Sequence, residues 1–357
     1  MKIALLGDLG FFGKYSLKNN KNLFKYFEEV SKLLKIYDIV IGNLETPFIE
    51  PNFSEFGIKS AYLGTDKENV KLLQYLNIGI VNISNNHIFD YGRDGYKNTL
   101  KILDEYKIKY FGNNQTLYLD EYEEKIALTG WCCYSTNGLG YSNNSTGIQA
   151  LDGKKLEREL LKNKRNGYLN IASIHCGEEH INYPNYDHIL LGRKISEKVE
   201  YIYYGHHPHV LQGVEEKNGS LLAYSLGNFC FDDIYDKTKK IFKLKQNENN
   251  KETMVLSLEI RDGKLLKYEF IPIVHLEDGI KVGDKKILEK IKKYSNMLKL
   301  EENEYRNLRK NKLDKYYKKR KTLKWYIKKI NLKSMLLLYS SKKNKIKYNE
   351  VIKKYIL

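Results

Sequence analysis

The feature of this sequence that most restricts its fold is the alternation of short apolar runs with helix-patterned segments over its first 280 residues. The apolar runs are rich in β-branched and aromatic residues and have the length of strands. They lie at 2–7, 37–42, 79–83, 125–130, 168–174, 200–204, 221–225 and 254–260. Helical patterns separate several of them, at 23–34, 67–76, 95–106 and 187–199. This order predicts an α/β fold with largely parallel strands that turns antiparallel toward its end.

The positive charge of the chain is confined to its last part. The formal net charge is +17, and residues 281–357 alone hold 26 Lys and Arg against seven Asp and Glu. The first 280 residues are therefore nearly neutral. The change in composition predicts a domain at 1–279 and a Lys-rich helical extension at 280–357.

The extension allows three interpretations. Residues 323–339 interleave Trp325 and the run Leu336-Leu337-Leu338 with lysines. Such a pattern fits a helix pair that packs on the core and leaves a solvated basic face. It also fits an amphipathic element at an anionic lipid surface, or a contact with nucleic acid or an acidic polymer. Composition does not separate these, and we expect no specific nucleic-acid partner.

Composition also excludes several protein classes. A hydrophobic fraction of 42% rules out a wholly disordered chain. Four Cys, two of them adjacent at Cys132 and Cys133, make no disulfide framework. The first apolar run ends at Asp8 and is too short for a signal peptide, and no stretch reaches the roughly 20 apolar residues of a membrane span. We expect a cytoplasmic protein; the lipid-surface interpretation of the extension would add peripheral association at the inner membrane.

Polar side chains follow five of the first six predicted strands, at the point where each strand ends. In open α/β sheets this edge is where ligands bind. Each residue alone has a structural interpretation, such as a turn, a helix cap or a hydrogen-bonded core histidine. Their coincidence favours two divalent cations with mixed oxygen and nitrogen ligands. The residues are Asp8; Asn43 and Glu45; Asn85, Asn86 and His87; His175; and His206, His207 and His209.

These residues, in this order, resemble the CapA family of poly-γ-glutamate capsule proteins, within the calcineurin-like metallophosphoesterase superfamily. The resemblance covers roughly residues 1–275, and its last two blocks are long and specific. The matching blocks are Gly7-Asp8, 43–47, 85–92 with Gly95, Thr99 and Leu100, 175–179, 205–212 and 224–232.

The resemblance implies a sandwich of two β-sheets flanked by helices, with two divalent cations (Mn, Fe, Zn or Mg) at the strand ends. It makes Glu45 the bridging carboxylate and His87 the imidazole that contacts the phosphate and protonates the leaving group. His87 and Asp90 are the implied catalytic residues. The implied metal ligands are Asp8, Glu45, Asn86, His175, His207 and His209. Residues expected around them, where they would orient the histidines, are Asn43, Glu179, His206, Asn228 and Asp232.

The chain departs from the family pattern in places. The usual Asp-x-His motif has Gly10 at the position of its histidine. Lys14, Cys176 and His180 stand where the family often has Arg, Trp and Tyr. These departures bear on the number of metals and on the substrate more than on the fold.

Two functions fit the resemblance. The first is a metal-dependent phosphoesterase of capsule or surface-polymer metabolism, which hydrolyses a phosphate ester with a water activated by two metals. The second is a non-catalytic binding or assembly subunit of capsular polymer synthesis. The near-complete ligand set favours the enzyme, and Gly10 favours the subunit. The partners expected are a phosphorylated small molecule or surface-polymer intermediate and, through the extension, an anionic membrane surface or capsule-synthesis proteins.

Overall fold

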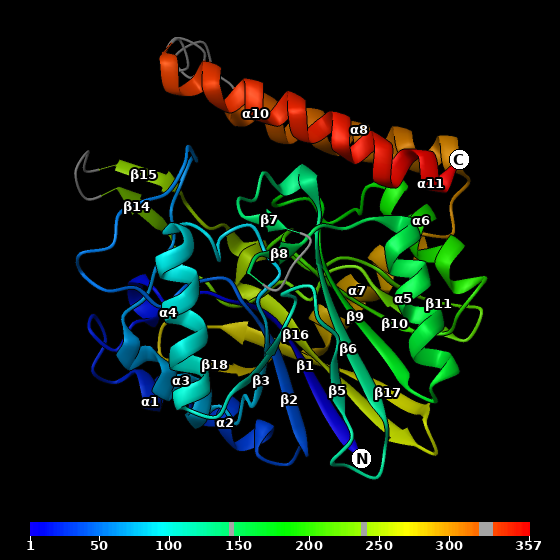
Figure 1. Cartoon of the computed structure of the whole chain (residues 1–357), viewed down its shortest axis with the longest axis horizontal. Helices are drawn as coiled ribbons and strands as arrows, with labels where there is room; N and C mark the ends of the chain where they lie inside the picture. Colours follow the sequence, from blue (N-terminus) through cyan, green and yellow to red (C-terminus); the bar gives the residue numbers. More distant parts are fainter. Residues whose placement is uncertain (143–145, 237–240, 321–330) are drawn as a thin grey trace.

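The computed structural model describes residues 1–142, 146–236, 241–320 and 331–357. Two β-sheets pack face to face, and helices cover the outer face of each (Figure 1). The fold predicted from the sequence, an α/β sandwich flanked by helices, is confirmed.

The first sheet has the strand order β18-β17-β16-β1-β2-β3-β4, and β13 also pairs with β1. Strands β1 to β4 and β13 run parallel to one another, whereas β16 pairs antiparallel with β1 and β17, and β17 pairs antiparallel with β18, as the sequence predicted. The strands are β1 (Lys2–Leu9), β2 (Ile39–Leu44), β3 (Ile80–Asn82), β4 (Lys109–Phe111), β13 (Asn228–Cys230), β16 (Glu252–Arg261), β17 (Lys264–His275) and β18 (Ile280–Val282).

The second sheet has the order β11-β12-β10-β9-β6-β5, with parallel pairing from β12 through β6. Its strands are β5 (Leu117–Leu119), β6 (Ile126–Cys132), β9 (Leu169–His175), β10 (Ile202–His206), β11 (Val214–Lys217) and β12 (Ser220–Ala223). Two short pairs lie outside both sheets: β7 (Tyr141–Ser142) with β8 (Ile148–Gln149), and β14 (Ile234–Asp236) with β15 (Ile241–Leu244).

Burial on both faces explains why the strands read as continuous apolar runs. Along β1, Ile3 and Leu5 point into the core between the sheets, while Ala4 and Leu6 join the core under the helices of the first sheet. The Tyr204 hydroxyl crosses between the sheets and donates to the carbonyls of Leu6 and Ile41. The two sheets are therefore held in a fixed relation.

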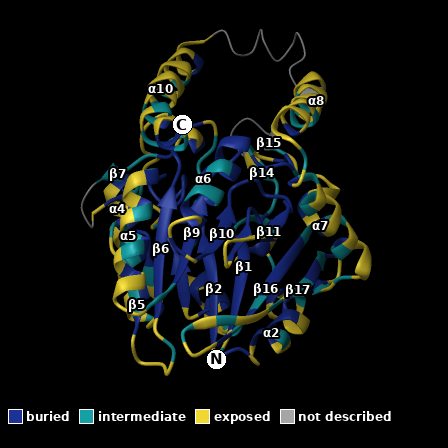
Figure 2. Ribbon diagram, turned by 90° about the vertical axis from the view of Figure 1, so that its right-hand side faces the viewer, coloured by how far each residue is buried: buried dark blue, intermediate teal, exposed yellow. Residues whose placement is uncertain are grey.

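The helices form the outer layers of the molecule (Figure 2). The first sheet is covered by α1 (Leu23–Tyr26), α2 (Glu28–Leu34), α3 (Val70–Tyr75) and α4 (Gly92–Glu105). The second is covered by α5 (Gly153–Arg165) and α6 (Tyr186–Ser196). Short helical turns lie at Gly13–Tyr15, Lys67–Asn69, Tyr134–Thr136 and Glu248–Lys251.

The basic extension continues the same structure. The compositional boundary at residue 279 lies directly before β18, so the first residues after it belong to the first sheet. The helices that follow are α7 (Lys285–Met297), α8 (Glu302–Arg320), α10 (Leu332–Tyr348) and α11 (Lys354–Ile356), with a π-helical turn at Asn349–Lys353. Trp325, which we singled out in the sequence, lies outside the described residues.

Both cores include side chains from the extension. Ile287 and Ile291 of α7 join the core between the sheets, and Tyr305, Ile352 and Tyr355 join the core under α6. Helices α8 and α10 lie at the end of the molecule to which the parallel strands point (Figures 1 and 2). Within the residues that are described, no helix has the length and apolarity needed to cross a membrane.

Candidate metal centre

The predicted site residues meet at the carboxyl ends of the strands from both sheets. Asp8, near the end of β1, is in register with Asn43 of β2 and with Asn228 of β13. In the facing sheet, His175 ends β9 and His206 ends β10, and the two residues are in register. The centre thus lies across the interface between the sheets.

Asp8, Glu45 and His209 form a buried group whose candidate ligand atoms all lie within 4.8 Å of one another. Asp8 Oδ1 accepts a hydrogen bond from Asn43 Nδ2 at 2.8 Å, and Asp8 Oδ2 lies 3.3 Å from His209 Nδ1. Glu45 follows β2, and its backbone N–H donates to the Leu9 carbonyl at 3.0 Å. Two carboxylates and an imidazole are therefore held together by strands that are distant in sequence.

The charges of this group are strongly coupled. Burial raises the pKa of Asp8, but hydrogen bonds from His206 and His209 outweigh it and hold that pKa well below its usual value. Burial and the neighbouring Asp8 charge raise the pKa of Glu45 well above its usual value. Burial opposes a charged His209, yet Glu45 and Asp8 raise its pKa to about 10. The two carboxylates therefore require nearby positive charge.

Several buried polar atoms in the centre have no hydrogen-bond partner among the described residues. They are Glu45 Oε2, His206 Nε2, His207 Nδ1 and Asn228 Nδ2. Buried polar atoms are paired in most native structures because an unpaired one costs about 1–3 kcal/mol. Unpaired carboxylate and imidazole atoms beside a cluster of ligand atoms fit a divalent cation.

Asn86, His175 and His207 form a second group next to the first. Asn86 Oδ1 lies 2.8 Å from His175 Nε2, and the rings of His175 and His207 are 4.8 Å apart between centroids. Burial, together with the nearby His207 charge, holds the pKa of His175 well below its usual value, and burial lowers that of His207 to about 3. Both imidazoles are thus neutral, which is the form that ligates metals.

His87 and Asp90 form a buried pair beside these groups. His87 Nδ1 lies 2.7 Å from Asp90 Oδ2, an arrangement in which Nδ1–H donates and Nε2 is left for other contacts. Burial and the Lys59 charge lower the pKa of His87 in spite of the Asp90 carboxylate. Burial opposes an ionised Asp90, but the charges of Lys59 and His87 outweigh it and lower the pKa of Asp90.

Lys59 is a site residue that the sequence analysis missed. Its buried ammonium group pairs with Asp90, donates to the Asn86 carbonyl at 2.5 Å and lies 3.2 Å from His87 Nδ1. It comes from the irregular segment between β2 and α3. A single Lys in such a segment carries no local sequence signal, so only the folded path of the loop reveals it.

The backbone that presents the last two histidines is unusual. His207 has a φ of 94° and His209 a φ of 57°, values in the region that non-glycine residues seldom adopt. Pro208 lies between them, and Asn250 Nδ2 donates to the His209 carbonyl at 2.7 Å. Such conformations persist where the surroundings enforce them, and they concentrate at functional sites.

Four of the five residues expected around the centre lie there. Asn43 Nδ2 reaches Asp8, His206 Nδ1 lies 3.1 Å from Asp8 Oδ1, and Asn228 Oδ1 lies 2.8 Å from His209 Nδ1. The Glu179 side chain is partly exposed beside the centre, and the charges of His207 and His209 outweigh the desolvation of its carboxylate and lower its pKa.

Asp232 has a different environment. Its Oδ2 accepts a hydrogen bond from the Lys14 backbone N–H at 2.6 Å. A Cβ on Gly13, whose φ is 59°, would lie 2.0 Å from the same oxygen. Asp232 therefore holds the turn after β1, and its expected role in orienting a histidine stays a prediction.

Gly10, at the position where the sequence analysis expected the histidine of the superfamily's Asp-x-His motif, is enclosed by two aromatic rings. A Cβ at this position would lie 2.8 Å from both Phe12 and Phe231. These two rings pack edge to face at 5.0 Å, and Phe231 also lies 4.5 Å from the His209 ring. Aromatic packing thus occupies the place of the missing ligand.

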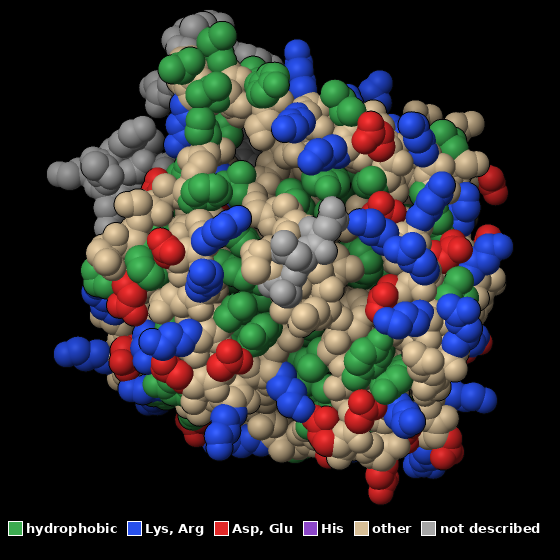
Figure 3. Space-filling view, viewed as in Figure 1, with side chains coloured by type: hydrophobic (Ala, Val, Ile, Leu, Met, Phe, Trp, Pro, Cys, Tyr) green, Lys and Arg blue, Asp and Glu red, His purple; other side chains and the backbone are tan. Residues whose placement is uncertain are grey.

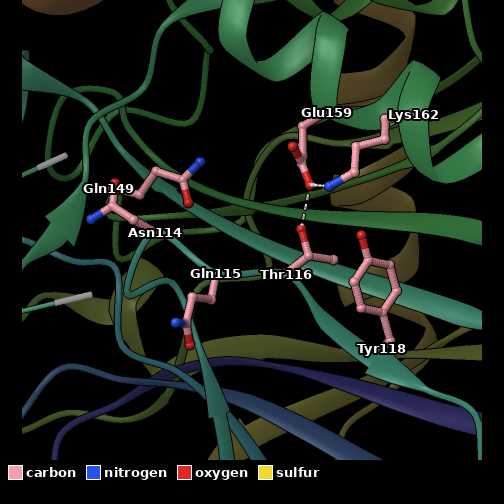
Figure 4. A pocket seen from close by; sticks show the side chains of 7 residues that line it. All are labelled: Asn114, Gln115, Thr116, Tyr118, Gln149, Glu159 and Lys162. Atoms are coloured by element: carbon pink, nitrogen blue, oxygen red, sulfur yellow. Dashed lines mark hydrogen bonds and ion pairs between the residues drawn. The ribbon is translucent and has the colours of Figure 1, made fainter. Parts of the chain in front are cut away.

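A cleft of about 390 Å³ lies apart from this centre, between residues 114–118 and helix α5 (Figure 4). Glu159 accepts a hydrogen bond from Thr116 at 2.7 Å and pairs with Lys162 at 3.6 Å there. The cleft is lined by Asn114, Gln115, Thr116, Tyr118, Gln149, Glu159 and Lys162, none of which is a predicted site residue.

Solved structures with low sequence identity align with most of the chain. A hypothetical protein from Thermus thermophilus aligns with a TM-score of 0.48 at 12% identity, over 76% of this chain and 98% of that one. A 5'-nucleotidase precursor from the same organism aligns with a TM-score of 0.44 at 13% identity, over 83% of this chain and 58% of that one.

Sequence comparison gives closer relatives. "PGA biosynthesis protein CapA" of Bacillus subtilis (strain 168) is 30% identical over 249 residues, 67% of this chain. The match spans 65% of that relative, slightly less than two thirds of its length. "Capsule biosynthesis protein CapA" of Bacillus anthracis is 27% identical over 282 residues, 74% of this chain and 68% of the relative. Residues 2–233, which hold every candidate metal ligand, match the bacterial capsule synthesis protein family PGA_cap, and the chain belongs to that family.

Proposed function

We propose that this protein is a metal-dependent phosphoesterase of capsule or surface-polymer metabolism. The observation that carries the proposal is the buried group of Asp8, Glu45 and His209, with all its candidate ligand atoms within 4.8 Å. The names of the Bacillus relatives, which refer to capsule and PGA biosynthesis, support the biological setting. The proposed substrate is a phosphorylated small molecule or a surface-polymer intermediate.

In this proposal two sets of residues hold divalent cations. Asp8, Glu45 and His209 would hold one cation, and Asn86, His175 and His207, together with the Glu45 carboxylate, would hold the other. Bound cations at such a site polarise a phosphoryl oxygen and lower the pKa of a water molecule. Mixed carboxylate, amide and imidazole ligands suit Mn, Fe, Zn or Mg.

The remaining residues position the phosphate and donate a proton to the leaving group. His87 presents Nε2 toward the substrate because its Nδ1 is held by Asp90 at 2.7 Å. In its charged form this imidazole protonates the departing oxygen, a role worth about 10²–10⁴-fold in rate. Lys59 holds Asp90 from the other side and keeps the pair in place.

A non-catalytic binding or assembly subunit is the second candidate. The observation that favours it is Gly10, whose surroundings leave no room for the usual histidine. A centre with one ligand fewer retains the residues to bind a phosphorylated group.

Metal analysis together with an activity assay separates the two functions. The purified protein would be analysed for metals and assayed with p-nitrophenyl phosphate and bis-p-nitrophenyl phosphate in the presence of Mn²⁺. Bound metal with turnover supports the phosphoesterase. Bound metal without turnover of either ester supports the subunit, and the absence of both overturns the metal centre.

A further inference from the structure

Helix α10 carries its apolar side chains on the face that points away from the protein. Leu332, Met335, Leu336 and Tyr339 are spaced three and four residues apart, so they share one helix face. Leu332 is 73% exposed, Met335 65% and Tyr339 72%. A surface helix normally turns such a stripe toward the core.

The face of α10 that contacts the protein is polar by comparison. Ser334 and Tyr348 are buried, and Tyr348 donates to Asp187 at 3.2 Å. Asn344 Nδ2 donates to Asn137 at 3.3 Å. Because its inner face is satisfied by these contacts, the helix cannot turn its apolar stripe inward without losing them.

Basic residues lie at both ends of the apolar stripe, Lys333 at its start and four lysines at 342–347 after it. Helix α10 contains five lysines and no acidic residue over its whole length. In Figure 3, hydrophobic side chains gather at the upper left, where α10 begins, and Lys and Arg side chains lie further along the same edge. A second copy of the chain would present the same positive charge, which disfavours self-association through this face. An anionic surface with an apolar interior matches both the apolar stripe and the positive charge of α10.

The loop beside α10 extends this surface. Lys333 lies over the Tyr62 ring at 5.5 Å, which places the start of α10 next to the segment between β2 and α3. Phe56 and Ile58 of that segment are exposed as well. Apolar side chains from two separate elements thus face outward at the same end of the molecule.

We infer that α10 docks on an anionic phospholipid bilayer, with Leu332, Met335, Leu336 and Tyr339 in the interfacial layer and the flanking lysines on the headgroups. The inference does not depend on the metal centre, so either can fail without the other. Apolar burial supplies part of the affinity and the charged contacts supply the rest.

The test uses the full-length protein and sedimentation with vesicles. We expect binding to phosphatidylcholine vesicles that contain phosphatidylglycerol, weak binding to phosphatidylcholine alone, and loss of binding as salt rises. The variant Leu332→Ser/Met335→Ser/Tyr339→Ser should bind at least about tenfold more weakly. The matched control is Leu266→Ser/Leu276→Ser/Val282→Ser, which removes three exposed apolar side chains outside α10 and should leave binding unchanged.

A fluorescent label reports which face touches the lipid. All four native cysteines are buried, so a cysteine introduced by Met335→Cys can be labelled selectively with an environment-sensitive dye. Vesicles should shift its emission to the blue, whereas a label at Leu266→Cys should not respond.

Three results would overturn the inference. The first is an absence of binding to anionic vesicles at low salt. The second is equal binding by the α10 variant and the wild type. The third is a dimer in solution, without lipid, that the α10 variant loses, because the stripe would then be covered by a second copy.

Discussion

The Nζ atom of Lys59 lies 3.2 Å from Nδ1 of His87, and both side chains are buried. Two groups that can each carry positive charge are stable at this distance because Asp90 contacts both. Asp90 Oδ2 also accepts the Leu63 backbone N–H at 2.7 Å, so the carboxylate fixes the loop as well as the imidazole.

Lys59→Met should destabilise the fold, because it leaves the Asp90 carboxylate buried without its cation. Breaking a buried ion pair in this way costs about 3–5 kcal/mol. Urea unfolding of Lys59→Met, Asp90→Asn and the double variant would measure this loss of unfolding free energy. The double variant should lose less than the sum of the single losses, and strict additivity would show that the two residues do not interact.

His209→Ala should lower the metal content while the fold is retained, since His209 is one of three side chains in the first group. The measurement is elemental analysis alongside circular dichroism. His275→Gln is the matched control, because it removes another buried imidazole, one that pairs with Tyr15. Full metal occupancy in His209→Ala would remove His209 from the ligand set.

His87→Ala should retain metal and lose rate, by about 10²–10⁴-fold for esters with poor leaving groups. Esters with good leaving groups need little protonation, so their rates should fall less. The comparison is made between alkyl and nitrophenyl phosphates with the same variant. An equal loss for both classes would argue against proton donation by His87.

The stability of the protein should fall in acid because His275 is buried and neutral. Burial lowers its pKa to about 3, whereas an unfolded histidine titrates near 6.5. As the pH falls below about 6.5 the unfolded chain binds this proton first, so stability is lost progressively toward pH 3. The loss from this residue at pH 5 should be about 2 kcal/mol. Urea unfolding at pH 7 and pH 5 checks it, and His275→Gln should show a smaller difference if the assignment is correct.

The sequence predicted the fold and the gathering of polar residues because both follow from periodic burial. All eight predicted strands are present, and their ends bring Asp8, Glu45 and His209 together from positions up to about 200 residues apart. The role of these residues as ligands stays a prediction. The sequence indicated these residues because they follow apolar runs.

Other features depend on loop paths and on distant packing, which leave no periodic signal. Lys59 reaches His87 only through the path of its loop, and Asp232 turned out to hold the turn at Lys14. Packing of the extension on the core was one of three interpretations of its composition, and its sparse apolar residues Tyr305 and Ile352 are fully buried. The many charged residues between them interrupt the apolar periodicity of the extension, so composition alone did not place these two residues in the core.

The position of the centre across the two sheets has a consequence for folding. Asp8 and His206 touch although 198 residues separate them in the chain. Contacts between such distant residues form late, because a long loop must close first. A partly folded chain with only one sheet in place therefore has only part of the ligand set. Metal bound here would select molecules in which both sheets have already docked, and its release would accompany any separation of the sheets.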